Sequence, residues 1–158
     1  MIPSRSNRQK AFGLIGLLLI TFAAPALSSF IPMPGEWYDS LQKPSWNPPA
    51  WLFGPVWGAL YTFMAIAAWL VWLHKGLARP LHLYMGQLAV NAAWTPVFFG
   101  LHRIDMALGV IVVLWLAVLM TMLAFFRVRA GAGWLLVAYL LWVSFATFLN
   151  FTLWRLNS

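Results

Sequence analysis

Five long stretches of this chain contain no Asp, Glu, Lys or Arg. They cover about residues 11–31, 50–73, 81–101, 106–126 and 130–154. Each is long enough to cross about 30 Å of hydrocarbon at about 1.5 Å per residue. Because lipid offers the backbone no hydrogen-bond partners, each stretch is expected to be a helix. With 63% hydrophobic and 8% charged residues, the chain is expected to form one all-α transmembrane domain of five helices over residues 1–158.

Proline positions indicate where these helices begin and where they are irregular. Pro49 and Pro80 lie at the starts of the second and third stretches, where a missing backbone N–H has little cost. Pro25 and Pro96 lie inside the first and third stretches and predict local kinks or unwound turns. Apolar residues 97–100 follow Pro96, so the third helix is expected to continue in a bent form.

Basic residues are distributed unevenly between the two ends of the predicted helices. Seven lie on the side of the N-terminus and of the second and fourth loops: Arg5, Arg8, Lys10, Lys75, Arg79, Arg127 and Arg129. The other side carries three basic and all three acidic residues: Lys43, Arg103, Arg155, Glu36, Asp39 and Asp105. This asymmetry predicts an N-terminus inside and a C-terminus outside. The membrane is expected to be that of a bacterial cell. The alternative for the first stretch is a cleaved signal peptide ending near residues 24–26.

The first loop, residues 36–49, reads EWYDSLQKPSWNPP and is no plain polar connector. Its three aromatic residues and three prolines favour a fixed shape or a ligand contact. Glu36 and Lys43 suit the two ends of a helix dipole, so a short helix is expected from Gly35 to Lys43, ended by Pro44. This helix would form a lid over the bundle mouth or anchor the loop at the headgroup level, and composition favours neither alternative.

Several classes of chemistry are excluded by what the predicted spans lack. No charged side chain lies in mid-span, which argues against a pump or an ion-coupled transporter. His74, His82 and His102 lie near span ends, where an interfacial position is expected rather than haem or metal ligation. The chain has no cysteine, so disulfides and thiolate sites are excluded. We therefore expect no tightly bound cofactor and no metal, and the dispersed net charge of +7 gives no nucleic-acid interface.

Neutral polar and aromatic side chains are what the predicted spans do contain. Gln87, Asn91 and Thr95 recur every four residues and form a polar stripe, which must face protein or a cavity. Hydrogen bonding between helices and ligand contact both fit this stripe. Two further faces combine rings with alanines and suit a flat apolar ligand, although ordinary packing explains each Trp taken singly. These faces are Trp57, Tyr61, Ala65, Ala68 and Trp72, and Tyr139, Trp142, Ala146 and Asn150.

Four sequence motifs are spread over the first loop and three of the spans. They are Trp37-Tyr38 with Leu41-x-Lys43-Pro44-x-Trp46-x-Pro48-Pro49; Trp57 with Tyr61; Gln87-Leu88-x-x-Asn91-x-x-Trp94-Thr95-Pro96-x-Phe98-Phe99-Gly100; and Tyr139-Leu140-x-Trp142-x-x-Phe145-Ala146-Thr147-x-Leu149-Asn150. Together they resemble the TspO/MBR family, the tryptophan-rich sensory proteins and translocator proteins (peripheral benzodiazepine receptors). The resemblance covers about residues 12–155.

The resemblance implies five transmembrane helices, commonly in a homodimer, with the first loop over a ligand pocket. Small residues four apart, Gly54/Gly58 and Ala89/Ala93, permit close helix contacts in such a dimer. The implied ligands are porphyrins and haem-type tetrapyrroles, sterols such as cholesterol, and synthetic isoquinoline carboxamides or benzodiazepines. The implied ligand-binding residues are Trp46, Asn47, Trp57, Tyr61, Asn91, Trp94, Trp142, Phe145 and Ala146.

Two positions depart from the family pattern. Ala138 replaces the Pro that often precedes the Tyr-Leu of the last helix, which predicts a straighter helix there. Phe151 stands where the sterol-recognition stretch has a Tyr, so strong sterol recognition is not expected.

The resemblance leads to a receptor or sensor for tetrapyrroles as the first hypothesis. Lys43 or Arg103 at the outer mouth would meet the porphyrin carboxylates. A passive transporter of tetrapyrroles or lipids is the second hypothesis, because the sequence offers no coupling-ion site. The third is a light-dependent porphyrin-degrading enzyme, with Trp57 and Trp142 as candidate catalytic residues. A structural membrane protein without a ligand is the fourth.

Overall fold

The computed structural model describes residues 5–31 and 35–158, which form helices and loops, with no strand among these residues. In chain order the elements are α1 (Asn7–Ser28), α2 (Glu36–Ser40), α3 (Ala50–Lys75), α4 (Arg79–Thr95), the π-helical turn η1 (Pro96–Gly100), α5 (Ile104–Phe126) and α6 (Ala130–Leu156). Within the described residues, four helices are long and apolar enough to cross a membrane: α1, α3, α5 and α6. The protein is therefore an all-α, multi-pass integral membrane protein.

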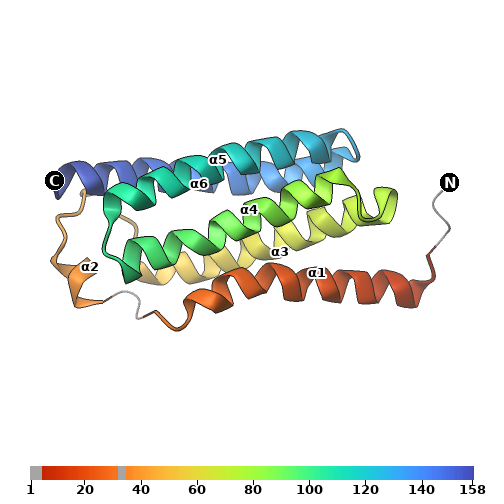
Figure 1. Cartoon of the computed structure of the whole chain (residues 1–158), viewed down its shortest axis with the longest axis horizontal. Helices are drawn as coiled ribbons and strands as arrows, with labels where there is room; N and C mark the ends of the chain where they lie inside the picture. The colour runs from red at the N-terminus through yellow and green to blue at the C-terminus, as the bar shows by residue number, and fades with distance from the viewer. Residues whose placement is uncertain (1–4, 32–34) are drawn as a thin grey trace.

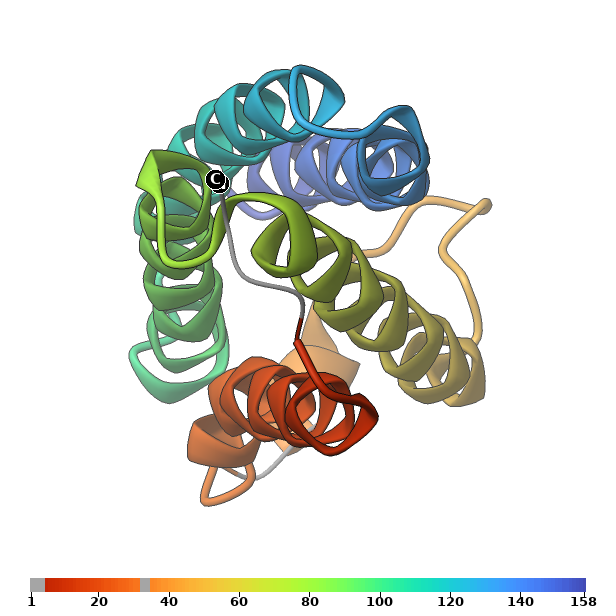
Figure 2. The ribbon, with the colours of Figure 1, turned by 90° about the vertical axis from the view of Figure 1, so that its right-hand side faces the viewer.

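The long helices lie side by side in one bundle, as Figure 1 shows. Helix α5 packs between α4 and α6, and α3 packs against α1 and α6. Helix α1 completes the bundle by packing against α3 and α4 (Figure 2). It buries only three side chains, Thr21, Ala24 and Ser28, so most of its apolar surface is left for lipid.

Local sequence signals explain where α1 and α3 begin and end. Ser6 and Gln9 form a reciprocal capping box, so α1 starts at Asn7, before the uncharged stretch begins. The helix continues through Pro25 and ends three residues later at Ser28. Helix α3 starts directly after Pro49 and ends at Lys75, before Gly76, whose φ of 63° suits a glycine.

Pro96 changes the helical repeat at the end of α4. Proline has no N–H to donate, so the α-helical ladder loses one hydrogen bond at Pro96, and the proline ring crowds the preceding turn. The chain instead forms η1, in which the Leu101 N–H donates to the Pro96 carbonyl at 2.9 Å, a spacing of five residues. The expected bent continuation of this helix is thus a π-helical turn, and it places Phe98 and Phe99 at the end of the bundle where α2 lies.

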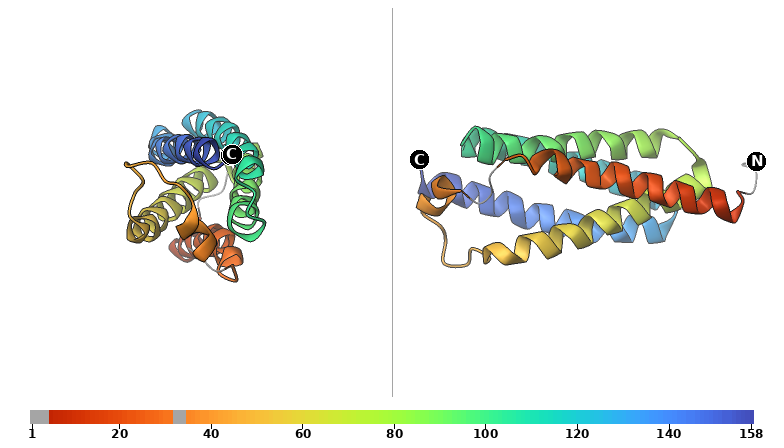
Figure 3. Two further views of the ribbon diagram at one scale, coloured as in Figure 1. Left: turned by 90° about the vertical axis from the view of Figure 1, so that its left-hand side faces the viewer. Right: turned by 90° about the horizontal axis from the view of Figure 1, so that it is seen from below.

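The first loop contains the expected short helix, although it is shorter than predicted. Helix α2 ends at Ser40, because Leu41 is already extended and the Lys43 ammonium donates to the Asp39 and Leu41 carbonyls at 3.1 and 3.2 Å. The helix therefore ends before Pro44 takes effect. Residues 35–49, called the lid below, cross the end of the bundle that also holds the C-terminus (Figure 3, left).

Candidate functional site

A continuous group of aromatic rings joins the lid, α3 and α6. The Trp57 ring stacks on Tyr61 at 5.4 Å and meets the edge of Trp142 at 6.5 Å and 89°. Trp142 in turn contacts Phe145 at 5.3 Å and Phe53 at 6.0 Å. Trp46 of the lid meets Phe145 at 6.0 Å. We call this group the aromatic cluster: Trp46, Phe53, Trp57, Tyr61, Trp142 and Phe145.

A buried hydrogen-bond chain lies directly beneath this cluster. The Tyr61 hydroxyl donates to Asn91 Oδ1 at 2.7 Å, and Asn91 Nδ2 donates to the Tyr139 hydroxyl at 2.9 Å. Tyr139 then donates to Gln87 Oε1 at 3.1 Å, and Gln87 Nε2 contacts the Met64 sulfur at 3.8 Å. All five side chains are buried.

This chain of hydrogen bonds fixes the position of Trp57. Its ring touches both tyrosines, Tyr61 by stacking and Tyr139 edge to face at 6.2 Å, and the two hydroxyls are held by amides of α4. Of the two interpretations of the α4 polar stripe, the structure supports hydrogen bonding between helices, because both ends of the Asn91 amide already have protein partners.

Trp142 carries the unsatisfied polar atom of the cluster. Its indole Nε1 is buried, and it has no hydrogen-bond partner among the described residues. A buried N–H without an acceptor costs about 1–3 kcal/mol relative to a satisfied one. An acceptor atom on a ligand entering the cluster would satisfy this N–H.

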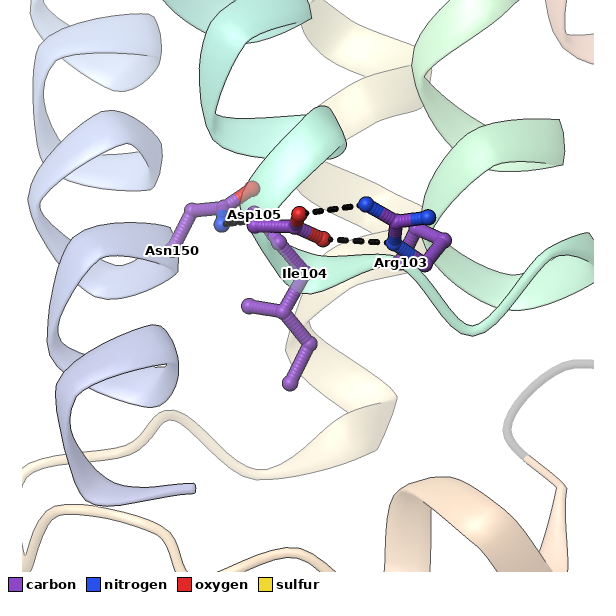
Figure 4. Close-up of polar contacts among 4 residues, drawn as sticks. All are labelled: Arg103, Ile104, Asp105 and Asn150. Atoms are coloured by element: carbon purple, nitrogen blue, oxygen red, sulfur yellow. Dashed lines mark hydrogen bonds and ion pairs between the residues drawn. The ribbon is translucent and has the colours of Figure 1, made fainter. Parts of the chain in front are cut away.

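The Trp94 indole is engaged differently. Its Nε1 donates to Asn150 Oδ1 at 3.0 Å. Asn150 Nδ2 in turn donates to the Ile104 carbonyl at 3.0 Å (Figure 4). The Trp94 ring stacks on Phe98 at 4.9 Å, in a second apolar group beneath the lid. Trp94 therefore connects α4, α5 and α6, and only its ring is left for a ligand.

The lid places its own aromatic residues at two positions. Trp37 stacks on His102 at 4.3 Å and 14°, and Tyr38 contacts Phe99 at 5.5 Å. Burial raises the pKa of the Tyr38 phenol. Farther along the lid, Trp46 stacks on Phe148 of α6 at 5.3 Å and 15°. The lid thus spans the bundle end from the α4–α5 connection to α6.

The two expected carboxylate-binding cations have different surroundings. Arg103 forms a two-bond ion pair with Asp105, at 2.9 and 2.6 Å (Figure 4), and this bond raises the pKa of the guanidinium. Lys43 lies 4.7 Å from the centre of the Tyr38 ring and bonds only backbone carbonyls. Its positive charge is not neutralised by a carboxylate in these contacts, so Lys43 is the better placed of the two for an anionic ligand.

The structure brings together most of the ligand-binding residues predicted from sequence. Five of them belong to the aromatic cluster: Trp46, Trp57, Tyr61, Trp142 and Phe145. Asn91 accepts a hydrogen bond from Tyr61 of the cluster, and Ala146 packs against the main hydrophobic core. Trp94 also packs against this core but stacks on Phe98 rather than on a ring of the cluster, and the Asn47 amide donates to the Pro48 carbonyl within the lid.

Phe53 and Phe148 were missed by sequence reasoning. Phe53 lies four residues before Trp57, a helical spacing that places both on one face, so periodicity could have found it. Phe148 contacts Trp46 across about 100 residues of sequence, and no local pattern indicates that contact.

A shallow apolar hollow of about 430 Å³ lies elsewhere, on α1, lined by Leu18, Leu19, Phe22, Ala23 and Ala26. It offers almost no polar atoms and opens outward, which suits lipid chains. We place the candidate site at the aromatic cluster because polar and aromatic groups converge there.

Comparison with known proteins finds one family over nearly the whole chain. Residues 14–155 match the TspO/MBR family. The tryptophan-rich sensory protein of Cereibacter sphaeroides is 48% identical over 144 residues, covering 89% of this chain and 91% of that protein. Protein CrtK of Rhodobacter capsulatus is 43% identical over 151 residues, covering 91% and 92%.

A eukaryotic relative shows a similar level of identity. The translocator protein of Homo sapiens is 43% identical over 145 residues, covering 85% of this chain and 86% of that protein. The family match spans the lid, the aromatic cluster and the hydrogen-bond chain beneath it. The chain belongs to the TspO/MBR family.

Proposed function

We propose that this protein is a membrane receptor or sensor that binds porphyrin or haem-type tetrapyrroles in the aromatic cluster. The observation that carries the proposal is the buried, unpartnered indole N–H of Trp142 beside the faces of Trp57 and Phe145. Flat rings supply stacking surface for a macrocycle, and the free N–H supplies one directional bond. A relative named tryptophan-rich sensory protein favours the sensor role.

The position of the lid supports the same proposal. Trp46 joins the cluster from the lid, so a ligand bound there would be covered from the end of the bundle. Lys43, whose ammonium bonds only backbone carbonyls, is the proposed partner for the propionate groups of a porphyrin. Sterols and benzodiazepine-type compounds are largely apolar and are proposed to occupy the same aromatic site. Binding of cholesterol is expected to be weak, because Phe151 stands where the sterol-recognition stretch has a Tyr.

Titration of the purified protein with protoporphyrin tests the ligand site. In detergent, the affinity of Trp57→Phe/Trp142→Phe is expected to fall about tenfold or more, because the double variant loses ring area and the Trp142 donor. Trp134→Phe is the matched control, since Trp134 lies on the same helix, is 66% exposed and contacts Phe126 outside the cluster. Equal affinity in the double variant and the wild type would reject the site.

Two further assays separate the sensor from the other functions. Uptake of porphyrin into proteoliposomes by the purified protein alone would establish passive transport, the activity suggested by the name of the human translocator protein. If porphyrin is degraded in the light by the wild-type protein but not by Trp57→Phe/Trp142→Phe, the protein is an enzyme. Binding without uptake or loss is the result expected for a receptor.

We also propose that α4, continued by η1, is a fifth membrane span and that the protein forms a homodimer. Helix α4 runs the length of the bundle beside α5 (Figure 1). Its exposed side carries small residues, Gly86, Ala89 and Ala93, which allow close approach of a second copy. Ala89→Leu is expected to shift cross-linked protein in detergent from dimer to monomer, and an unchanged dimer fraction would exclude this face.

A further inference from the structure

Contacts at three separate points hold the lid against the bundle, and one of them, Trp46 on Phe145 and Phe148, belongs to the candidate site. At its first half, Trp37 stacks on His102 and meets the edge of Phe98 at 5.6 Å. At Gln42, in its middle, the lid is bound by Asn157, which lies directly after α6. The two residues of this second contact are 115 positions apart in the chain, so it is a true tertiary contact.

The side-chain amide of Asn157 forms two hydrogen bonds with the backbone of Gln42, one as acceptor and one as donor. The Gln42 N–H donates to Asn157 Oδ1 at 2.9 Å, and Asn157 Nδ2 donates to the Gln42 carbonyl at 2.9 Å. The same Nδ2 also donates to the Leu153 carbonyl at 2.8 Å, which fixes the amide on the end of α6. Two parallel bonds from one amide set both the position and the orientation of the lid backbone.

The bonded lid segment leads directly to the candidate site. Gln42 precedes Trp46 by four residues, and Trp46 contacts Phe145 of the aromatic cluster. The Asn157 bonds are exposed to water, so they can open and close at small cost. Buried bonds such as those of Asn91 would not exchange so readily.

We infer that Asn157 is a latch: a positioning residue that holds the lid closed over the aromatic cluster and sets the rate at which ligands enter and leave. This inference rests on the proposed ligand site for its effect on exchange. Its structural part, the closed lid, can be measured without any ligand.

The position of the lid is measured first, on the ligand-free protein. The chain has no cysteine, so Ser45→Cys on the lid and Leu101→Cys on the bundle can be spin-labelled without background. Asn157→Ala is expected to lengthen and broaden the distance distribution between the labels. Asn157→Asp keeps the acceptor for the Gln42 N–H and loses the donor, so an intermediate distribution is expected.

Ser158→Ala is the matched control for this measurement. Its hydroxyl donates to the Trp154 carbonyl at the end of α6 and not to the lid, so this variant reports any effect of loosening the last turn of α6. A wild-type distance distribution in Asn157→Ala would overturn the latch.

The rate of ligand exchange is measured second, with protoporphyrin as the probe. Loss of two exposed hydrogen bonds is expected to speed dissociation from Asn157→Ala about three- to tenfold, with Ser158→Ala unchanged. If the lid opens in Asn157→Ala and the dissociation rate stays at the wild-type value, ligands do not exchange past the lid. If the wild type does not bind protoporphyrin at all, the proposed function fails, and the distance measurement still decides whether Asn157 is a latch.

Discussion

At the scale of single residues, Asn91 is the side chain on which the candidate site most depends. It accepts a hydrogen bond from Tyr61 and donates one to Tyr139, both in the buried interior. Asn91→Leu would leave the Tyr61 hydroxyl without its acceptor. We expect the variant to lose about 1–2 kcal/mol of stability, since hydrogen bonds between membrane helices contribute about 0.6–1.7 kcal/mol each. Unfolding in detergent by a denaturant titration measures this loss.

Thr62→Val is the control for the Asn91 prediction. The Thr62 hydroxyl donates to the Gly58 carbonyl of its own helix at 2.9 Å, so its removal breaks no contact between helices. A loss in Asn91→Leu no larger than that in Thr62→Val would contradict the role given to Asn91.

The residues of this site were predictable to different degrees. Spacing alone showed that Gln87 and Asn91 must face protein, since an amide in lipid is costly. Spacing could not identify the tyrosines that they bond, because Tyr61 and Tyr139 lie on other helices. The Asn157 latch had no sequence signal at all: it depends on where the end of α6 lies relative to a loop 115 residues away.

At the scale of elements, the contact between α1 and α3 depends on a glycine. Gly13 lies against the Trp72 ring so closely that any Cβ at this position would overlap it. The same ring lies 4.1 Å from the Arg5 guanidinium, which limits its freedom to move away. We expect Gly13→Ala to push the helices apart and to destabilise the protein by about 1–3 kcal/mol, measured by thermal unfolding in detergent.

The same helix offers a matched control. A Cβ at Gly16 would meet no atom within 4 Å, so Gly16→Ala is expected to be neutral or stabilising by up to about 1 kcal/mol through helix propensity. Equal effects of the two substitutions would show that the close approach of α1 to Trp72 is not required.

Helix ends were less predictable than helix existence. The uncharged stretches placed the helices correctly, because the absence of charge follows directly from the hydrocarbon environment. Their ends follow from side-chain contacts instead: the capping box of Ser6 and Gln9 starts α1 early, and Lys43 ends α2 early. Pro96 predicted a bend, and only the structure shows that this bend is a π-helical turn.

At the scale of the whole molecule, the bundle has two chemically different ends. The lid lies at the end with the C-terminus, and the start of α1 lies at the other (Figures 1 and 3). The N-terminal end carries seven of the ten basic residues and none of the acidic ones. At this end Arg5 donates to the Leu73 carbonyl and the Trp69 indole donates to the Lys10 carbonyl, so the start of α1 is bound to the end of α3.

This asymmetry predicts how the protein lies in a membrane. Basic residues are retained on the inner side, so the N-terminus is expected inside, and the lid and the C-terminus outside. Single cysteines can report this in a chain that has none: in intact spheroplasts, a membrane-impermeant maleimide is expected to label Ser158→Cys at once and Asn7→Cys only after permeabilisation. The reverse pattern would invert the orientation, and labelling of both sites in intact cells would place the two ends on the same side. The labelling result also decides on which side of the membrane the lid lies, and therefore from which side the proposed ligand would reach Trp46.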